Sequence, residues 1–112
     1  MAVSIRIETE AQKTLAFGSI VAGYTAVGTA LVKPARIILV QNLTDASLQF
    51  SFNGTDDHFP LPTNGFLLLD VTANNTDDSQ FVFPIGQLLY VKRIGTPTSG
   101  SVYFSSWYGD KD

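Results

Sequence analysis

The sequence predicts an all-β protein, a single antiparallel β-sandwich of about eight strands with jelly-roll or Greek-key topology. Three observations predict this fold. Apolar and polar residues alternate over short stretches, turn residues recur at intervals of roughly 8–12 residues, and no helical period of apolar residues is sustained. With 112 residues, of which 45% are hydrophobic and 15% charged, the chain can bury its own core. We therefore treat residues 1–112 as one domain.

The first part of the chain is expected to contain short strands. Residues 1–13 form a possible N-terminal arm with a strand over 3–8. Residues 14–32 carry no charge and approach the length of a membrane span. Three glycines and several hydroxyl side chains interrupt this stretch, which favours two short strands around glycine turns over a transmembrane helix. Residues 35–41 are rich in β-branched side chains and predict a further strand.

The second part alternates between strands and turns. In residues 47–53, Leu48, Phe50 and Phe52 alternate with polar side chains, as in a half-buried strand. Proline at position 60 cannot donate to a strand ladder, which places its strand at a sheet edge. After the turn at 42–46, strands are expected over 47–53, 58–61, 66–72, 79–83, 87–94 and 101–108.

Several of these strands are apolar on both faces. In residues 66–72, Leu67 and Leu69 occupy one face, while Phe66 and Leu68 lie on the other. A strand with one solvated face should be polar on that face. Two explanations stay open: another subunit covers part of the outer surface, or these are central strands beneath loops or the N-terminal segment.

Three aromatic residues near the C-terminus are expected on one outward face. Strand parity places Tyr90, Tyr103 and Trp107 opposite the apolar positions of their strands. Such a face suits a subunit contact or a sugar-stacking platform, unless the N-terminal strand covers it. With Phe66 and Leu68, these residues are the candidate interface or glycan-stacking residues.

Charge and composition exclude several function classes. Ten acidic and seven basic residues give a net charge of −3, so direct nucleic-acid binding is not expected. The chain has no cysteine, and its N-terminal residues lack the apolar core of a signal peptide. The nucleophile-elbow, phosphate-loop and dinucleotide-binding motifs are missing. The only histidine, His58, follows two aspartates in an expected solvated turn. We therefore expect no enzyme activity, no cofactor and no membrane partner.

Two acidic pairs are weak candidates for calcium binding. If the strands run alternately up and down, the loops at 53–57, 73–78 and 95–100 fall at one end of the sandwich. Their carboxylates would then meet near one another, and Ca²⁺ prefers six to eight oxygen ligands. Aspartate is also a common residue of ordinary turns, so no metal is assigned. The weak candidates are Asp56, Asp57, Asp77 and Asp78.

Four motifs resemble a family of small β-sandwich accessory virion proteins of tailed bacteriophages. The motifs are an N-x-T-D turn, an S-x-N/D-G-x-D turn, a central strand and a C-terminal pair of strands, in Asn42–Asp45, Ser51–Asp57, Gly65–Asp70 and Tyr90–Gly109. The resemblance covers roughly residues 24–109. It implies a capsid decoration protein or a head–tail neck or collar protein, present in many copies on the virion. It also implies no enzyme activity.

The sequence therefore predicts a non-enzymatic structural protein of a virion, made in the host bacterial cytoplasm. It would act by packing against capsid, portal or neck components, as a homo-oligomer. The N-terminal arm is expected to pair with the sheet edge of a neighbour, because exposed edges accept strands. The alternative function is a carbohydrate-binding β-sandwich module that recognises a host-surface glycan.

Overall fold

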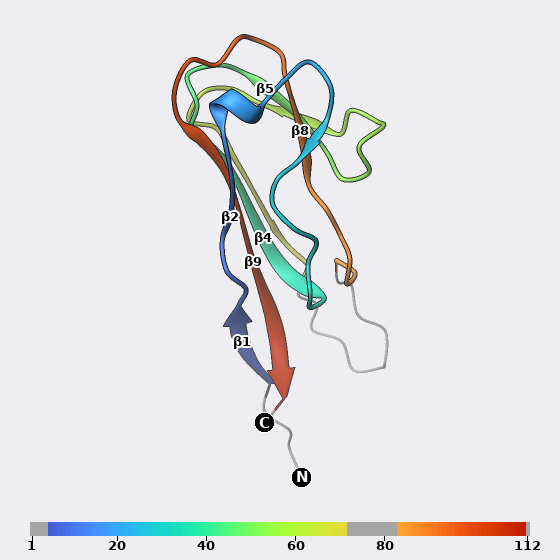
Figure 1. Cartoon of the computed structure of the whole chain (residues 1–112). Coiled ribbons are helices and arrows are strands. Elements are labelled where there is room, and N and C mark those ends of the chain that lie inside the picture. The colour runs from blue at the N-terminus through green and yellow to red at the C-terminus, as the bar shows by residue number, and fades with distance from the viewer. Residues whose placement is uncertain (1–4, 72–82, 112) are drawn as a thin grey trace.

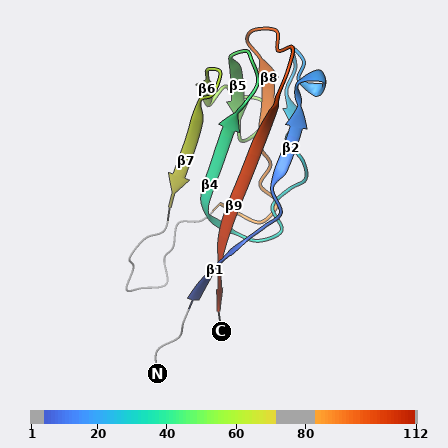
Figure 2. The ribbon, with the colours of Figure 1, turned by 90° about the vertical axis from the view of Figure 1, so that its left-hand side faces the viewer.

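A computed structural model describes residues 5–71 and 83–111, and it confirms the predicted all-β sandwich of two antiparallel sheets (Figures 1 and 2). Sheet A has the order β1-β9-β4-β7, and β2 also pairs with β9. Its strands are β1 (Ile5–Thr9), β2 (Lys13–Ala16), β4 (Ala35–Asn42), β7 (Phe66–Asp70) and β9 (Ser101–Lys111). Sheet B has the order β3-β8-β5-β6. Its strands are β3 (Thr25–Ala26), β5 (Leu48–Ser51), β6 (Phe59–Leu61) and β8 (Tyr90–Arg93).

The pairing pattern of the strands is that of a jelly roll. Strands β1 and β2 pair with successive parts of β9, so they share one strand position. The remaining pairs are nested in chain order: β3 pairs with β8, β4 with β7, and β5 with β6. A long hairpin that is rolled into two sheets produces this order. The only helix in the described residues is the short 3-10 turn Phe17–Ser19, and no described helix is long and apolar enough to cross a membrane.

The core lies between the two sheets and follows the predicted alternation. In β4, Ile38 and Val40 are fully buried, and they face Leu48 and Phe50 of β5 across the sandwich core. Neighbouring residues of β4 point outward and are only partly buried. A cluster of aromatic rings, in which Phe50 stacks on Phe59 with centroids 5.2 Å apart, closes one part of the core. The period of two in the sequence therefore identifies the inward-facing side chains.

Some strand limits differ from the prediction. The strand expected over 87–94 begins only at Tyr90. Before it, the backbone of Gln87 and Leu89 bonds to the loop after β3 instead of to a strand. Of the strand expected over 79–83, only Phe83 is described, and it forms an isolated bridge with Ala35. The last strand is longer than expected, because β1 continues its ladder as far as Lys111.

The prediction that the loops at 53–57 and 95–100 lie at the same end of the sandwich is wrong. Strands β5 and β8 are antiparallel neighbours, with Leu48 opposite Arg93 and Ser51 opposite Tyr90. The loop that follows β5 and the loop that follows β8 therefore leave from opposite ends. Between these loops the described residues form three strands, β6, β7 and β8, and each strand takes the chain to the other end of the sandwich. Asp77 and Asp78, in the loop at 73–78, lie outside the described residues.

The molecule is elongated, with extents of 55 × 23 × 21 Å. Strand β1 and the C-terminal part of β9 project together beyond the rest of the sandwich, and both chain termini lie at this end (Figure 1). In the single chain, the described part of the expected N-terminal arm pairs with its own β9. The pairing of the arm with a neighbour's sheet edge stays a prediction.

Candidate functional site

Large apolar and aromatic side chains gather on the outside of sheet A. Phe66 and Leu68 of β7 are 65% and 55% exposed. The other members are partly buried on the same outer side of β4 and β9, because the residues that alternate with them fill the core. We call this set the apolar face: Ile37, Leu39, Phe66, Leu68, Tyr103 and Trp107.

The strand register joins these residues into one continuous surface. Leu39 lies directly opposite Leu68 on β7. Ile37 lies opposite Trp107 on β9. Gln41 lies between Phe66 and Tyr103, so the two aromatic rings belong to the same row across the sheet. Figure 2 shows β7, β4, β9 and β2 side by side. Directly opposed side chains on antiparallel strands are close enough to touch, so the face is a single patch.

The outside of sheet B is covered differently. Loop residue Tyr24 donates a hydrogen bond to the carboxylate of Asp57, which also pairs with Lys92 of β8 at 3.0 Å. The ammonium of Lys92 lies 4.8 Å from the centroid of the Tyr24 ring. This network ties the loops before β3 and after β5 across the outer side of β8. The chain thus covers part of sheet B with its own polar loops. On the outside of sheet A, the side chain of Gln12 donates a hydrogen bond at 3.1 Å to Ser105, which lies between Tyr103 and Trp107.

The same network shifts two titrations. Desolvation and the hydrogen bond to Asp57 raise the pKa of Tyr24 to about 12. The hydrogen bond from Tyr24 and the contact with Lys92 lower the pKa of Asp57 from its usual value. Both shifts favour a phenol that keeps its proton and a carboxylate that keeps its charge. This arrangement stabilises loops and leaves no unpaired acid or base for proton transfer.

The prediction that Tyr90, Tyr103 and Trp107 share one outward face is wrong. Tyr103 and Trp107 belong to β9 in sheet A, whereas Tyr90 belongs to β8 in sheet B. The outer sides of the two sheets point in opposite directions, so the three rings cannot form one stacking platform. The ring of Tyr90 instead packs over Gly54, where an added Cβ atom would lie 3.2 Å from the ring. The alternation of side chains along a strand shows which residues face the core and which face outward, but it does not show which sheet the strand joins.

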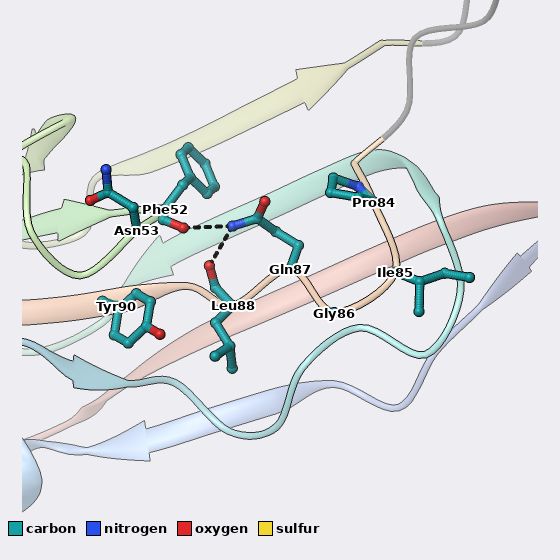
Figure 3. Close-up of a pocket in the computed structure, with 8 residues that line it drawn as sticks. All are labelled: Phe52, Asn53, Pro84, Ile85, Gly86, Gln87, Leu88 and Tyr90. Carbon is teal, nitrogen blue, oxygen red and sulfur yellow. Dashed lines mark hydrogen bonds between the residues drawn. The ribbon is translucent and has the colours of Figure 1, made fainter.

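A shallow pocket of about 260 Å³ lies beside Tyr90 (Figure 3). Its lining combines Phe52 and Asn53 with residues 84–88 and Tyr90. The side-chain nitrogen of Gln87 donates to the carbonyl oxygens of Phe52 and Leu88, both at 2.7 Å. The side chain of Asn53 is occupied by the turn that it closes. The amide groups of the pocket therefore serve the fold.

The acidic loop and the histidine serve the local structure as well. Asp56 accepts a hydrogen bond from Asn53, and Asp57 is engaged by Tyr24 and Lys92. The Nδ1 atom of His58 accepts a hydrogen bond from the backbone N–H of Phe52 at 2.9 Å, which closes the loop. Among residues 5–71 and 83–111, no three histidine, aspartate or glutamate side chains come together as a metal site.

Comparison of the chain with family models, with curated proteins and with solved structures found no match.

Proposed function

We propose that this protein is a non-enzymatic structural component of a tailed-phage virion, a capsid decoration protein or a head–tail neck or collar protein. It is made in the bacterial cytoplasm and packs as a homo-oligomer against capsid, portal or neck components. The observation that carries this proposal is the apolar face on the outside of sheet A. The motifs that resemble accessory virion proteins support it, and they include β7 and most of β9, two of the three strands that build this face.

The apolar face has the chemistry of a protein–protein contact. Full burial of a side chain such as Phe66 or Leu68 contributes roughly 1.5–3 kcal/mol. Gln41 and Ser105, which lie between the apolar residues on β4 and β9, are neutral and polar. Asp70, opposite Ile37 at the end of β7, is charged and lies at the border of the face, as in the polar rim of a protein interface. A particle that offers many equivalent sites adds multivalency, so each contact can be smaller than a stand-alone interface.

The proposal is tested with particles assembled from a phage genome that lacks this reading frame. The purified chain is added, and co-sedimentation with the particles is measured. The wild-type chain is expected to bind saturably. The double variant Phe66→Ser/Leu68→Ser is expected to bind at least about a hundredfold more weakly, because each of the two lost side chains removes more than about 1.4 kcal/mol of contact energy. A wild-type chain that does not bind the particles would overturn the proposal.

The matched control is Val32→Ser/Ile94→Ser. These side chains are 67% and 58% exposed, close to the exposures of Phe66 and Leu68, but neither lies in a strand of sheet A. The control is expected to bind like the wild type. Equal losses in both double variants would mean that general hydrophobicity, and not the apolar face, drives binding.

The alternative function, a carbohydrate-binding module, is tested on the same proteins. A glycan array is probed with the wild type and with Trp107→Ala. Because the three-ring platform does not form, we expect no glycan binding. A hit that is lost in Trp107→Ala would favour the carbohydrate module over the virion component.

A further inference from the structure

Strand β1 stands outside the hydrophobic core. No described residue of β1 belongs to the core cluster, and Ile7 is 53% exposed. Its partner, the C-terminal part of β9, has its last core residue at Phe104. Strand β4 reaches β9 only as far as Tyr108, so from Gly109 onward β1 is the only described strand beside β9. Within the described residues, the projecting ribbon therefore consists of two strands without a second layer, and such ribbons are marginally stable in water.

The chain is held firmly just after β1. Both carboxylate oxygens of Glu10 accept backbone hydrogen bonds, one from Val32 at 3.3 Å and one from Lys33 at 3.1 Å. The same carboxylate pairs with Lys13 at 3.9 Å, and its side chain is only 6% exposed. The backbone N–H of Glu10 donates to Ser106 at 3.2 Å. The sandwich therefore anchors the chain from Glu10 onward, and the junction between Thr9 and Glu10 is a pivot.

A bulge marks this pivot. Between the paired residues Thr9–Trp107 and Lys13–Phe104, three residues on the N-terminal side face two residues of β9. The extra residue interrupts the ladder, so β1 and β2 do not form one continuous strand. Bulges bend the strand that carries them and end regular pairing. Strand β1 can thus leave β9 without disturbing β2, whose Leu15 packs against the core.

We propose that β1 also pairs with the C-terminal part of β9 in a second copy of this chain, by strand exchange about the junction between Thr9 and Glu10. The exchanged pair has the same sequences and the same register as the pair within one chain, so it needs no new contact. Exchange couples copies through their projecting ends and leaves the apolar face free for another protein. The purpose of the exchange, which is to link neighbouring copies on a particle, rests on the proposed function.

The partner is a second copy because of what the vacated edge would offer. When β1 leaves, the backbone N–H and C=O groups of residues 107–111 form an open edge that accepts an antiparallel strand. In a solution of the protein, β1 of another copy is the strand whose side chains match this edge of β9 and whose concentration is highest. The tethered strand competes at an effective concentration of the order of 1 mM, so exchange should grow as the protein concentration approaches this value.

The test uses single cysteines, because the chain contains none of its own. Ile7 and Gly109 lie directly opposite each other in the β1–β9 ladder. The variant Ile7→Cys, isotope-labelled, is mixed with unlabelled Gly109→Cys and oxidised gently over a protein concentration series. Only exchange places the two cysteines of different chains together. Mass spectrometry then measures the disulfide-linked product that contains one chain of each variant.

The control mixture is Ala16→Cys with Ser101→Cys. These residues face each other across β2 and β9, where the ladder packs on the sandwich and cannot exchange. The Ile7→Cys and Gly109→Cys mixture is expected to give an excess of mixed product over this control, and the excess should rise with concentration. Equal yields in both mixtures at every concentration would overturn the inference.

A second pair of cysteine variants provides the same test if one of the first two variants fails to fold. Glu8→Cys and Tyr108→Cys also lie opposite each other in the β1–β9 ladder, and the same excess is expected from them. The experiment contains no particles, so its failure leaves the proposed virion function standing. Conversely, failure of the Phe66 and Leu68 variants to affect particle binding leaves strand exchange untouched.

Discussion

The buried side-chain oxygen of Asn42 accepts two hydrogen bonds from Thr44, one from its backbone N–H at 3.0 Å and one from its hydroxyl at 2.6 Å. The side-chain nitrogen of Asn42 donates to the carbonyl oxygens of Ala46, Leu61 and Pro62 at 2.9–3.1 Å. Asn42 ends β4 of sheet A, whereas Leu61 ends β6 of sheet B. One fully buried amide therefore joins the two sheets at this end of the sandwich.

Replacement of this amide is expected to destabilise the fold strongly. Asn42→Ala should lower the free energy of unfolding by about 3 kcal/mol, because the buried polar groups of Thr44, Ala46 and Leu61 would lose their hydrogen-bond partner. Asn42→Asp should be worse at neutral pH, because its carboxylate would face three carbonyl oxygens. Urea unfolding measures both changes. Asn53→Ala, at an exposed turn asparagine, is the control, and an equally large loss there would contradict the assignment.

Stability should fall in acid because of Asp45 and Asp57. Hydrogen bonds from the hydroxyl and backbone of Thr98 lower the pKa of Asp45, and Tyr24 and Lys92 lower the pKa of Asp57. A lowered folded-state pKa adds stability above the unfolded value of about 3.9, and this stability is lost as the pH falls through the folded value. Between neutral and acid pH, the free energy of unfolding should depend less on pH in the double variant Asp45→Asn/Asp57→Asn than in the wild type. An unchanged slope would argue against both contacts.

Tyr24 should produce the opposite dependence at high pH. Its pKa is raised to about 12, so the folded state holds the phenolic proton more tightly than the unfolded state does. The stability from this group is present below the unfolded pKa of about 10 and disappears as the pH approaches 12. Ultraviolet titration of the phenol groups should show a late component from Tyr24. Tyr24→Phe should remove it, and a titration that keeps the late component would disprove the assignment.

Gly100 is expected to tolerate no side chain. Its φ angle is +88°, and a Cβ atom would lie 2.0 Å from the backbone oxygen of Leu43. Gly100→Ala should therefore lower the unfolding free energy by more than about 2 kcal/mol, through left-handed strain and a backbone clash. Gly18→Ala, where no atom lies within 4 Å of the added Cβ, is the matched control. Thermal unfolding that shifts both variants equally would refute the clash.

Two N-terminal truncations should distinguish the contribution of β1 to stability from the contribution of the Glu10 carboxylate, which accepts hydrogen bonds from the backbone of Val32 and Lys33. Deletion of residues 1–9 should cost less than about 1 kcal/mol, because β1 contributes no described residue to the core. Deletion of residues 1–12 should cost about 1–3 kcal/mol more, because the N–H groups of Val32 and Lys33 lose the Glu10 carboxylate. Urea unfolding compares the two forms. Equal stabilities of the two truncated forms would show that the hydrogen bonds of Glu10 contribute nothing.

Much of the fold follows from local pattern. The alternation of Leu48, Phe50 and Phe52 predicts an inward face, and Phe50 is fully buried. Pro60 predicts an edge strand, and β6 is the last strand of sheet B. The exposed Phe66 and Leu68 were also identified from parity alone. These features are readable because the side chains of a strand alternate strictly between its two sides, whatever the strand pairs with.

The sequence by itself thus determined the fold class, the inward-facing residues and four residues that lie on the apolar face, namely Phe66, Leu68, Tyr103 and Trp107. Only the tertiary structure decided that Tyr90 lies on a different sheet from Tyr103 and Trp107, and that the loops after β5 and β8 lie at opposite ends. It also revealed Asn42, which looks like an ordinary turn residue, as a buried link between sheets. The physical reason is that pairing partners are chosen by long-range packing between strands, and no local pattern of side chains records that choice.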